Sequence, residues 1–217
     1  MARPVNADAD ATRQRMLDTA VELFAERGLG STSVRDVATG AGVSLAMVHH
    51  YFGSKDDLYR ACIDATYAEL SAMKAVLAVE LVSAAPLPEL FARAVGTSFR
   101  FACEHRTAVR LLVRAAVSSG ELHPRGRKLL LDALDVVSTA VGSRLGRPPS
   151  ELRLPLQSVV FLVARYAAQD EGETAAVVGL PTREKRRARE AVEAHLVDVA
   201  LGLFGLAQRH HLSEGSR

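Results

Sequence analysis

The stretch TSVRDVATGAGVSLAMVHHYFGSK, residues 32–55, decides how this chain folds. Its first half predicts a short helix that begins at Thr32 or Ser33. Ser33 and Asp36 have the spacing of a capping box, in which a hydroxyl and a carboxylate each bond a free amide at the start of a helix. Gly42 can then take the positive φ that a sharp reversal of the chain needs. The pattern therefore predicts a helix that ends in a tight turn.

The second half predicts another short helix directly after that turn. Ser44 is placed to cap a helix from Leu45 to about His50. Ser54 and Asp57 repeat the capping signature for a third, longer helix. Two short helices held across a tight turn form a helix-turn-helix, whose second helix, the recognition helix, enters the major groove of DNA.

The same stretch resembles the TetR family of bacterial transcription regulators. The resemblance rests on Ala38 and Gly42 at the turn, on GVS at residues 42–44 and on HHYFGSKDDLY at residues 49–59. Together with the amphipathic helix before it, the match covers about residues 12–60. The resemblance implies a ligand-responsive regulator, most often a repressor that a small effector releases from a palindromic operator in double-stranded DNA, with no cofactor.

Composition indicates an all-α protein. The 217 residues are 48% hydrophobic, 24% charged and only 5% aromatic, and strand signals are scarce. No apolar run is long enough to span a membrane, and the N-terminus lacks the apolar centre of a secretory signal. The two cysteines have neither metal-site nor disulfide spacing. We therefore expect a cytoplasmic protein with a DNA-binding domain at residues 1–54 and a helical effector-binding and dimerisation domain at residues 55–217.

Apolar periodicity and breakers predict the other elements. Residues 1–10 are polar and suggest a frayed tail, or an arm that reaches a minor groove. A proline at residue 155 is expected to begin the penultimate helix, and two glycines with a proline favour a loop over residues 169–182. The predicted helices cover about residues 11–27, 54–82, 88–104, 108–118, 124–145, 155–169 and 184–207.

The last two predicted helices are apolar around more than one side. Phe161 and Val163 on one, and Leu203 and Phe204 on the other, extend past a single stripe. A helix that is apolar on two sides needs a second partner. The family resemblance implies that these helices pair across a two-fold axis as a homodimer, which suits a palindromic site. The alternative is that both helices belong to a monomer core.

Charge alone does not indicate a nucleic-acid partner. The net charge is +2, and residues 1–55 hold six basic and six acidic side chains. Affinity for phosphate would have to come from local placement of charges and donors. This leaves open a helical protein-interaction module without effector-controlled DNA binding. An enzyme is disfavoured, because no phosphate-binding glycine loop, zinc-protease motif or nucleophile elbow occurs. We predict no catalytic residue and no metal site.

The resemblance assigns candidate DNA contacts. Arg35 aligns with a position that reaches a base in some relatives, although a phosphate contact or a salt bridge is an equal alternative. Leu45 departs from the family, which often has a basic or polar residue there, and this leaves apolar contact with a thymine methyl. His49 replaces a phosphate-binding tyrosine, and Lys55 matches a phosphate-binding lysine. The predicted DNA-binding residues are Arg35, Ser44, Leu45, Ala46, Met47, His49, His50, Tyr51 and Lys55.

An effector site is expected among the later helices. Its candidate residues are polar side chains on otherwise apolar helices, for which a surface or interhelical role is the plain alternative. With no tryptophan and few aromatics, an aliphatic-lined pocket for a lipophilic ligand is favoured over a stacking cage. The candidates are Arg100, Cys103, His105, Arg110, Arg114, Arg165, Tyr166 and Gln169.

Overall fold

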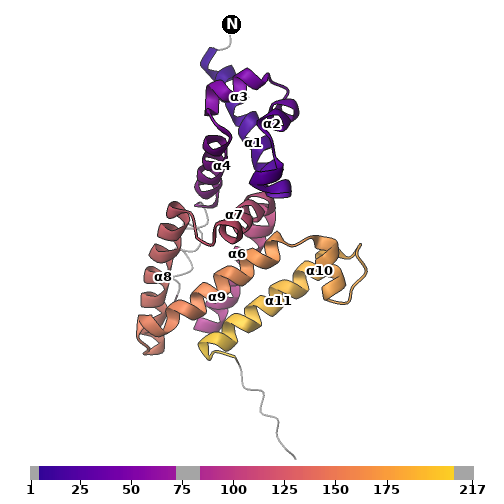
Figure 1. The fold of residues 1–217 in the computed structure, drawn as a ribbon. Helices are drawn as coiled ribbons and strands as arrows, with labels where there is room; N and C mark the ends of the chain where they lie inside the picture. Colours follow the sequence, from indigo (N-terminus) through magenta and orange to yellow (C-terminus); the bar gives the residue numbers. More distant parts are fainter. Residues whose placement is uncertain (1–4, 72–83, 208–217) are drawn as a thin grey trace, which may run out of the picture. The chain divides into compact units, whose positions relative to one another are not determined.

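The computed structural model describes residues 5–71 and 84–207, and within these ranges the chain forms ten α-helices and no strand (Figure 1). The predicted all-α class is confirmed. Two compact units can be distinguished. The first comprises Met1–Ala75, Phe101–Leu131 and Ala167–Gln169, and the second comprises Val76–Arg100, Asp132–Tyr166 and Asp170–Arg217. The division into DNA-binding and effector domains at residues 54 and 55 concerns function and stays a prediction.

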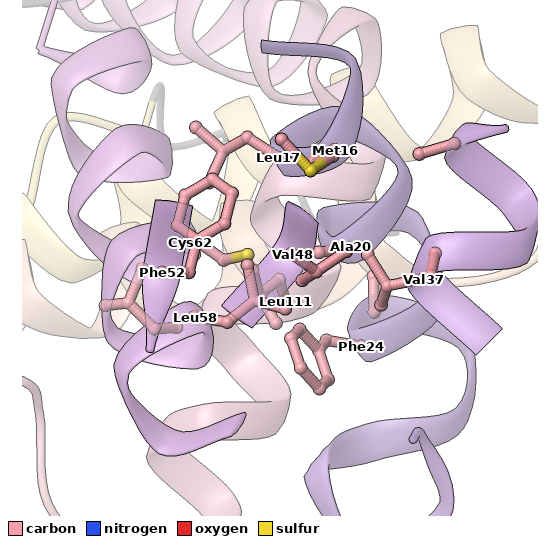
Figure 2. Packing of buried hydrophobic residues seen from close by; sticks show 14 residues of the cluster. Met16, Leu17, Ala20, Phe24, Val37, Val48, Phe52, Leu58, Cys62 and Leu111 are labelled. Atoms are coloured by element: carbon pink, nitrogen blue, oxygen red, sulfur yellow. The ribbon is translucent and has the colours of Figure 1, made fainter. Parts of the chain in front are cut away.

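The first unit is built on its N-terminal helix. α1 (Val5–Ser31) packs against α2 (Val34–Ala41), α4 (Lys55–Leu70) and α7 (Arg106–Ser119), while α3 (Leu45–Phe52) contacts α2 and α4. The shared core includes five apolar side chains from α1 to α4 and one from α7 (Figure 2). These are Phe24, Val37, Val48, Phe52, Leu58 and, from α7, Leu111.

The helix α1 begins earlier than predicted. It begins at Val5, whereas the sequence indicated residue 11 and a frayed tail before it. Asp8 lies in the first turn, where a carboxylate interacts favourably with the positive end of the helix dipole, so the acidic residues favour a helix here. The helix was predicted to end near residue 27; in the structure Gly28 has φ 81° and interrupts the helix there, and helical residues continue to Ser31. Thr32 then donates a hydrogen bond to the Gly28 carbonyl (2.9 Å), and Ser33 is the cap of α2.

The long helix predicted from residue 54 to residue 82 is shorter in the structure. α4 ends at Leu70, and Ser71 closes its last turn by donating its backbone N–H to the Tyr67 carbonyl (3.1 Å). The remaining part of the prediction, residues 72–82, lies outside the described residues.

The second unit takes its core from the later helices. α6 (Leu87–Glu104), α8 (Pro124–Leu145) and α9 (Pro149–Ala168) contribute residues to both units, and α10 (Glu171–Val177) packs against α11 (Lys185–Phe204). Apolar side chains from α6, α8, α9 and α11 are buried in the second unit. They include Leu90, Phe91, Val95, Phe99, Leu134, Val141, Leu152, Val163, Val192, Leu196 and Phe204.

Three boundaries in the second unit correct the sequence prediction. Pro155 lies inside α9 and does not begin it, because Leu152 before it and Val163 after it are both buried and hold the helix continuous. The predicted loop contains α10, which Asp170 caps by accepting hydrogen bonds from two backbone amides. The last helix ends at Phe204, because Gly205 takes the left-handed conformation (φ 70°).

No helix of the described segments combines the length and the apolar character needed to cross a membrane.

Candidate nucleic-acid interface

Reciprocal hydrogen bonds fix the start of α2. The Ser33 hydroxyl accepts from the Asp36 amide (3.1 Å), while the Asp36 carboxylate accepts from the Ser33 amide (2.8 Å). Hydrogen bonds from the Ser33 side chain and backbone also hold the pKa of Asp36 below its ordinary value. The predicted capping box is therefore confirmed, and the Asp36 charge is committed to the helix start.

The turn between α2 and α3 has the predicted geometry. Gly42 is left-handed (φ 66°, ψ 38°), and the Val43 amide donates to the Ala38 carbonyl (3.0 Å). The Ser44 hydroxyl then accepts from the Met47 amide (3.2 Å) and caps α3. Because α3 runs to Phe52, it is about half a turn longer than the predicted segment ending at His50.

A second capping box fixes the start of α4. Ser54 accepts from the Asp57 amide (3.2 Å), and the Asp57 carboxylate accepts from the Ser54 amide (3.2 Å). The side-chain hydrogen bond from Ser54, with the backbone one, lowers the pKa of Asp57. Arg60 also pairs with Asp57 (2.8 Å). The Asp57 carboxylate is therefore paired with Ser54 and Arg60, and it forms no ion pair with Lys55, the first residue of α4.

The helix α3 has one buried face and one exposed face. Val48 and Phe52 are buried in the core. Leu45 and Tyr51 are half-buried. The exposed side chains belong to the predicted DNA-contacting set and are Ala46, Met47, His49 and His50. This arrangement presents the leading edge of α3 outward on a rigid support.

His49 makes a contact that the sequence did not suggest. Its Nδ1 lies 2.8 Å from the Gly53 carbonyl oxygen. Because a carbonyl oxygen only accepts, Nδ1 carries the proton and donates it. In the neutral ring the other nitrogen, Nε2, then has no proton and can only accept. A phosphate oxygen can bind Nε2 only when the ring is an imidazolium, whereas the tyrosine of relatives donates its hydroxyl without a charge change.

Residues 1–55 have no net charge, but their acidic and basic side chains are not all paired with one another. Asp36 is held by Ser33. By contrast, Arg35 on the outside of α2 is exposed, Lys55 is half-buried, and neither forms an ion pair among the described residues. Basic side chains without a carboxylate partner are available to bind phosphate, even though residues 1–55 contain as many acidic as basic residues.

The eight predicted effector residues are distributed over the two units. Arg100, Arg165 and Tyr166 belong to the second unit. There, Arg100 pairs with Glu193, and the Tyr166 ring lies edge-on to His195. Arg165 is exposed. An effector role for these three residues stays a prediction.

The other five candidates belong to the first unit and are Cys103, His105, Arg110, Arg114 and Gln169. His105 contacts Glu69 through Nδ1, and Arg110 donates to the Ala168 carbonyl (3.2 Å). Arg106, which the sequence reasoning missed, donates to the Ala167 carbonyl (3.0 Å). The two arginines are four residues apart on α7, and together they bind the last carbonyls of α9. In the sequence, the four-residue spacing of Arg106 and Arg110 was the signal that could have indicated that both side chains lie on one face of α7. An effector role stays a prediction for these residues as well.

Cys62 lies buried in the core of the first unit. Burial raises the pKa of the Cys62 thiol to about 12, so it stays protonated. No group of three potential metal-ligating side chains was found among the described residues.

Comparison with known proteins identifies relatives of the first unit. Residues 16–62 match the family described as "Bacterial regulatory proteins, tetR family". The chain is 41% identical over 59 residues to the HTH-type transcriptional regulator AcrR of Shigella flexneri, a match that covers 27% of each chain. It is 40% identical over 68 residues to the HTH-type transcriptional repressor KstR2 of Mycobacterium tuberculosis, covering 30% of this chain and 34% of that protein. The matches thus span about a third or less of these curated relatives.

A solved structure has a similar fold over nearly the whole length of the chain. A TetR-like transcriptional regulator from Rhodococcus sp. RHA1 superposes with a TM-score of 0.60 and 24% sequence identity, covering 94% of this chain and 99% of that one. At this identity the likeness concerns the fold.

Proposed function

The chain belongs to the TetR family of bacterial regulators through its N-terminal helix-turn-helix, and from this premise we propose that it is a DNA-binding transcriptional regulator. The observation that carries the proposal is the outward leading edge of α3, supported by buried Val48 and Phe52. Regulation is proposed to be repression, relieved when a small effector binds. The proposed target is a two-fold symmetric operator.

Phosphate contacts are proposed to flank the recognition helix α3. Lys55 carries a charge without a carboxylate partner among the described residues, and it lies in the first turn of α4, where free amides point outward. The imidazolium form of His49 and the hydroxyl of the half-buried Tyr51 supply further donors near the end of α3. These contacts would set the position of α3 on the duplex without specifying its sequence.

Base contacts are proposed for the first turn of α3 and for Arg35. Ala46 and Met47 are exposed there, and Leu45 is half-buried. An apolar edge of this kind fits the methyl group of thymine in the major groove. Arg35 is the polar candidate, because its fork of donors can bind guanine. We therefore expect a half-site that contains a thymine whose replacement by uracil weakens binding.

Dimerisation is proposed through α9 and α11, as the family resemblance implies. Leu154 and Phe161 are 73% and 48% exposed, and they lie seven residues apart, on one face of α9. Leu203 exposes a further apolar side chain on α11. Large apolar side chains exposed along a helix are typical of a surface that another chain covers. Two copies of α3 related by a two-fold axis would then face successive major grooves.

The effector is proposed to be small and lipophilic, and to act by a population shift. It must bind more tightly to the conformation that does not fit the operator. The support is the scarcity of aromatic residues and the largely aliphatic core of the second unit. A thermal-shift screen that finds hydrophilic ligands and no hydrophobic ones would contradict the proposal.

DNA binding can be tested without knowing the operator. The wild-type protein is used to select duplexes from a random-sequence pool, and the affinity for the selected duplex is compared with that for a scrambled duplex of equal composition. We expect a selected site with two-fold symmetry. If the protein binds no duplex even at low ionic strength, where phosphate contacts are strongest, the proposed function is wrong.

A further inference from the structure

Arg13 has an unusual position at the end of the recognition helix. Its guanidinium carbon lies 5.1 Å from the centroid of the Phe52 ring, and Phe52 is the last residue of α3. We propose that Arg13 binds a DNA phosphodiester and that the Phe52 ring holds it in position. This inference rests on the proposed function and adds a phosphate ligand from α1.

The backbone of Arg13 is fixed on both sides. Because α1 begins at Val5, Arg13 lies about two turns inside the helix and not in a frayed first turn. Three residues further along, Met16 is completely buried in the core. The Arg13 side chain is therefore held at its backbone by a rigid helix and at its guanidinium by the Phe52 ring.

A cation–π contact does not use an oxygen acceptor. The guanidinium carbon of Arg13 lies over the Phe52 ring, and the group carries five N–H donors for which an aromatic ring supplies no oxygen partner. Among the described residues Arg13 makes no ion pair, and its side chain is exposed. A planar fork of donors with no carboxylate partner matches the geometry of a phosphate group.

The other arginines of α1 differ from Arg13. Arg15 extends from another side of the helix, and its guanidinium contacts the Thr12 hydroxyl (3.4 Å). Arg27 lies near Glu26 (3.8 Å). Of these three arginines, Arg13 is the one held against α3. Phe52 is also followed directly by the segment that leads to Lys55, the other proposed phosphate ligand.

The expected effect follows from counterion release. One phosphate contact contributes about 0.9 to the slope of log affinity against log salt, which corresponds to about an eightfold gain in affinity at 0.1 M salt relative to 1 M salt. In a dimer, Arg13→Gln should lower the slope by about 1.8 and the affinity at 0.1 M salt by about sixtyfold. Because phosphates carry no sequence information, the selected and the scrambled duplex should lose affinity equally.

The experiment measures fluorescence anisotropy of both duplexes, from 0.05 to 0.5 M salt, for four proteins: wild type, Arg13→Gln, Arg13→Lys and Arg15→Gln. Arg15→Gln is the matched control, because it removes the same charge two residues away and should change the slope far less. Arg13→Lys should keep the slope but bind more weakly than wild type, since an ammonium group lacks the planar fork. Melting temperatures establish that each variant is folded.

Three results would overturn the inference. One is an unchanged slope and affinity in Arg13→Gln. Another is an equal loss in Arg13→Gln and Arg15→Gln, which would indicate a general charge effect. The third is a loss confined to the selected duplex, which would make Arg13 a base contact. In each case wild-type binding leaves the proposed function intact, whereas failure of the wild-type protein to bind any duplex would refute both.

Discussion

The bond between His49 and Gly53 predicts that DNA binding depends on pH. Nδ1 of His49 donates to the Gly53 carbonyl (2.8 Å), so the neutral ring offers only an acceptor at Nε2. A phosphate oxygen is also an acceptor, and the contact therefore requires an imidazolium. The contact should be complete at low pH and lost as the pH rises.

The magnitude follows from one proton and one charge-assisted hydrogen bond per subunit. Because each subunit takes up at most one proton on binding, affinity can change by at most about tenfold per pH unit per subunit, or about a hundredfold for a dimer. A hydrogen bond to a charged group contributes about 1.5–3 kcal/mol. The total change in affinity between low and high pH should therefore be about tenfold to a hundredfold per subunit. The lowered pKa of the nearby Asp57 keeps its carboxylate ionised while the His49 contact changes.

The assay is fluorescence anisotropy with the selected duplex from pH 5.5 to pH 8.5 at constant ionic strength. His49→Gln retains a polar side chain that does not titrate, and it should remove the pH dependence. His50→Gln is the comparison variant: it removes the other imidazole of α3, which has an edge-on contact with Tyr51 and not the carbonyl bond of His49, so the pH dependence should persist whatever the change in affinity. Calorimetry in two buffers of different ionisation enthalpy should detect proton uptake. A wild-type affinity that does not change with pH, or a pH dependence that persists in His49→Gln, would refute the reasoning.

Four further predictions concern single side chains. Lys55→Ala should lower the salt slope by about 0.9 per subunit on every duplex, and an unchanged slope would remove Lys55 from the phosphate contacts. Arg35→Ala should relax one base position at a cost of about 1–3 kcal/mol, measured by repeating the selection, whereas a uniform loss would make it a backbone contact. Phe161→Glu should convert a dimer to a monomer in light scattering with little change in helix content, and an unchanged mass would place the interface elsewhere. Asp57→Asn should lower stability at neutral pH but little at strongly acid pH, because the stabilisation from the lowered pKa of Asp57 is complete above the ordinary value near 3.8 and is lost as the pH falls through the lowered value. An equal loss of stability at both pH values in denaturation curves would contradict this.

The local features of the DNA-binding unit could be predicted from the sequence because their causes are local. Ser33 with Asp36, and Ser54 with Asp57, form hydrogen bonds within four consecutive residues, so the spacing alone determines them. The left-handed turn at Gly42 follows from the backbone freedom of one residue.

The errors arose where packing decides the outcome. Pro155 normally favours a helix start, but burial on both sides of it keeps α9 continuous. The α10 helix lies among glycines and proline, where propensity favours a loop, and packing against α11 stabilises it. Tertiary contacts override weak local preferences at such positions.

In the candidate interface too, local features could be predicted and contacts between distant residues could not. Its helix order and exposed edge follow from apolar spacing, which the sequence contains. The Arg13 contact with Phe52 joins residues far apart in the chain, and no periodicity indicates it. The bond from His49 to Gly53 depends on the path of the chain after α3, which residue identities alone did not specify.

The central claim is that the leading edge of α3 lies against base pairs in two symmetry-related copies. The most direct test places a photo-crosslinking amino acid at the position of Met47, which is 39% exposed, and maps the bases crosslinked in the selected duplex. We expect crosslinks to bases, on their major-groove side, at two symmetric positions about one helical turn or a multiple of it apart. Full binding of the duplex without any crosslink from this position would show that the leading edge of α3 does not lie against the bases.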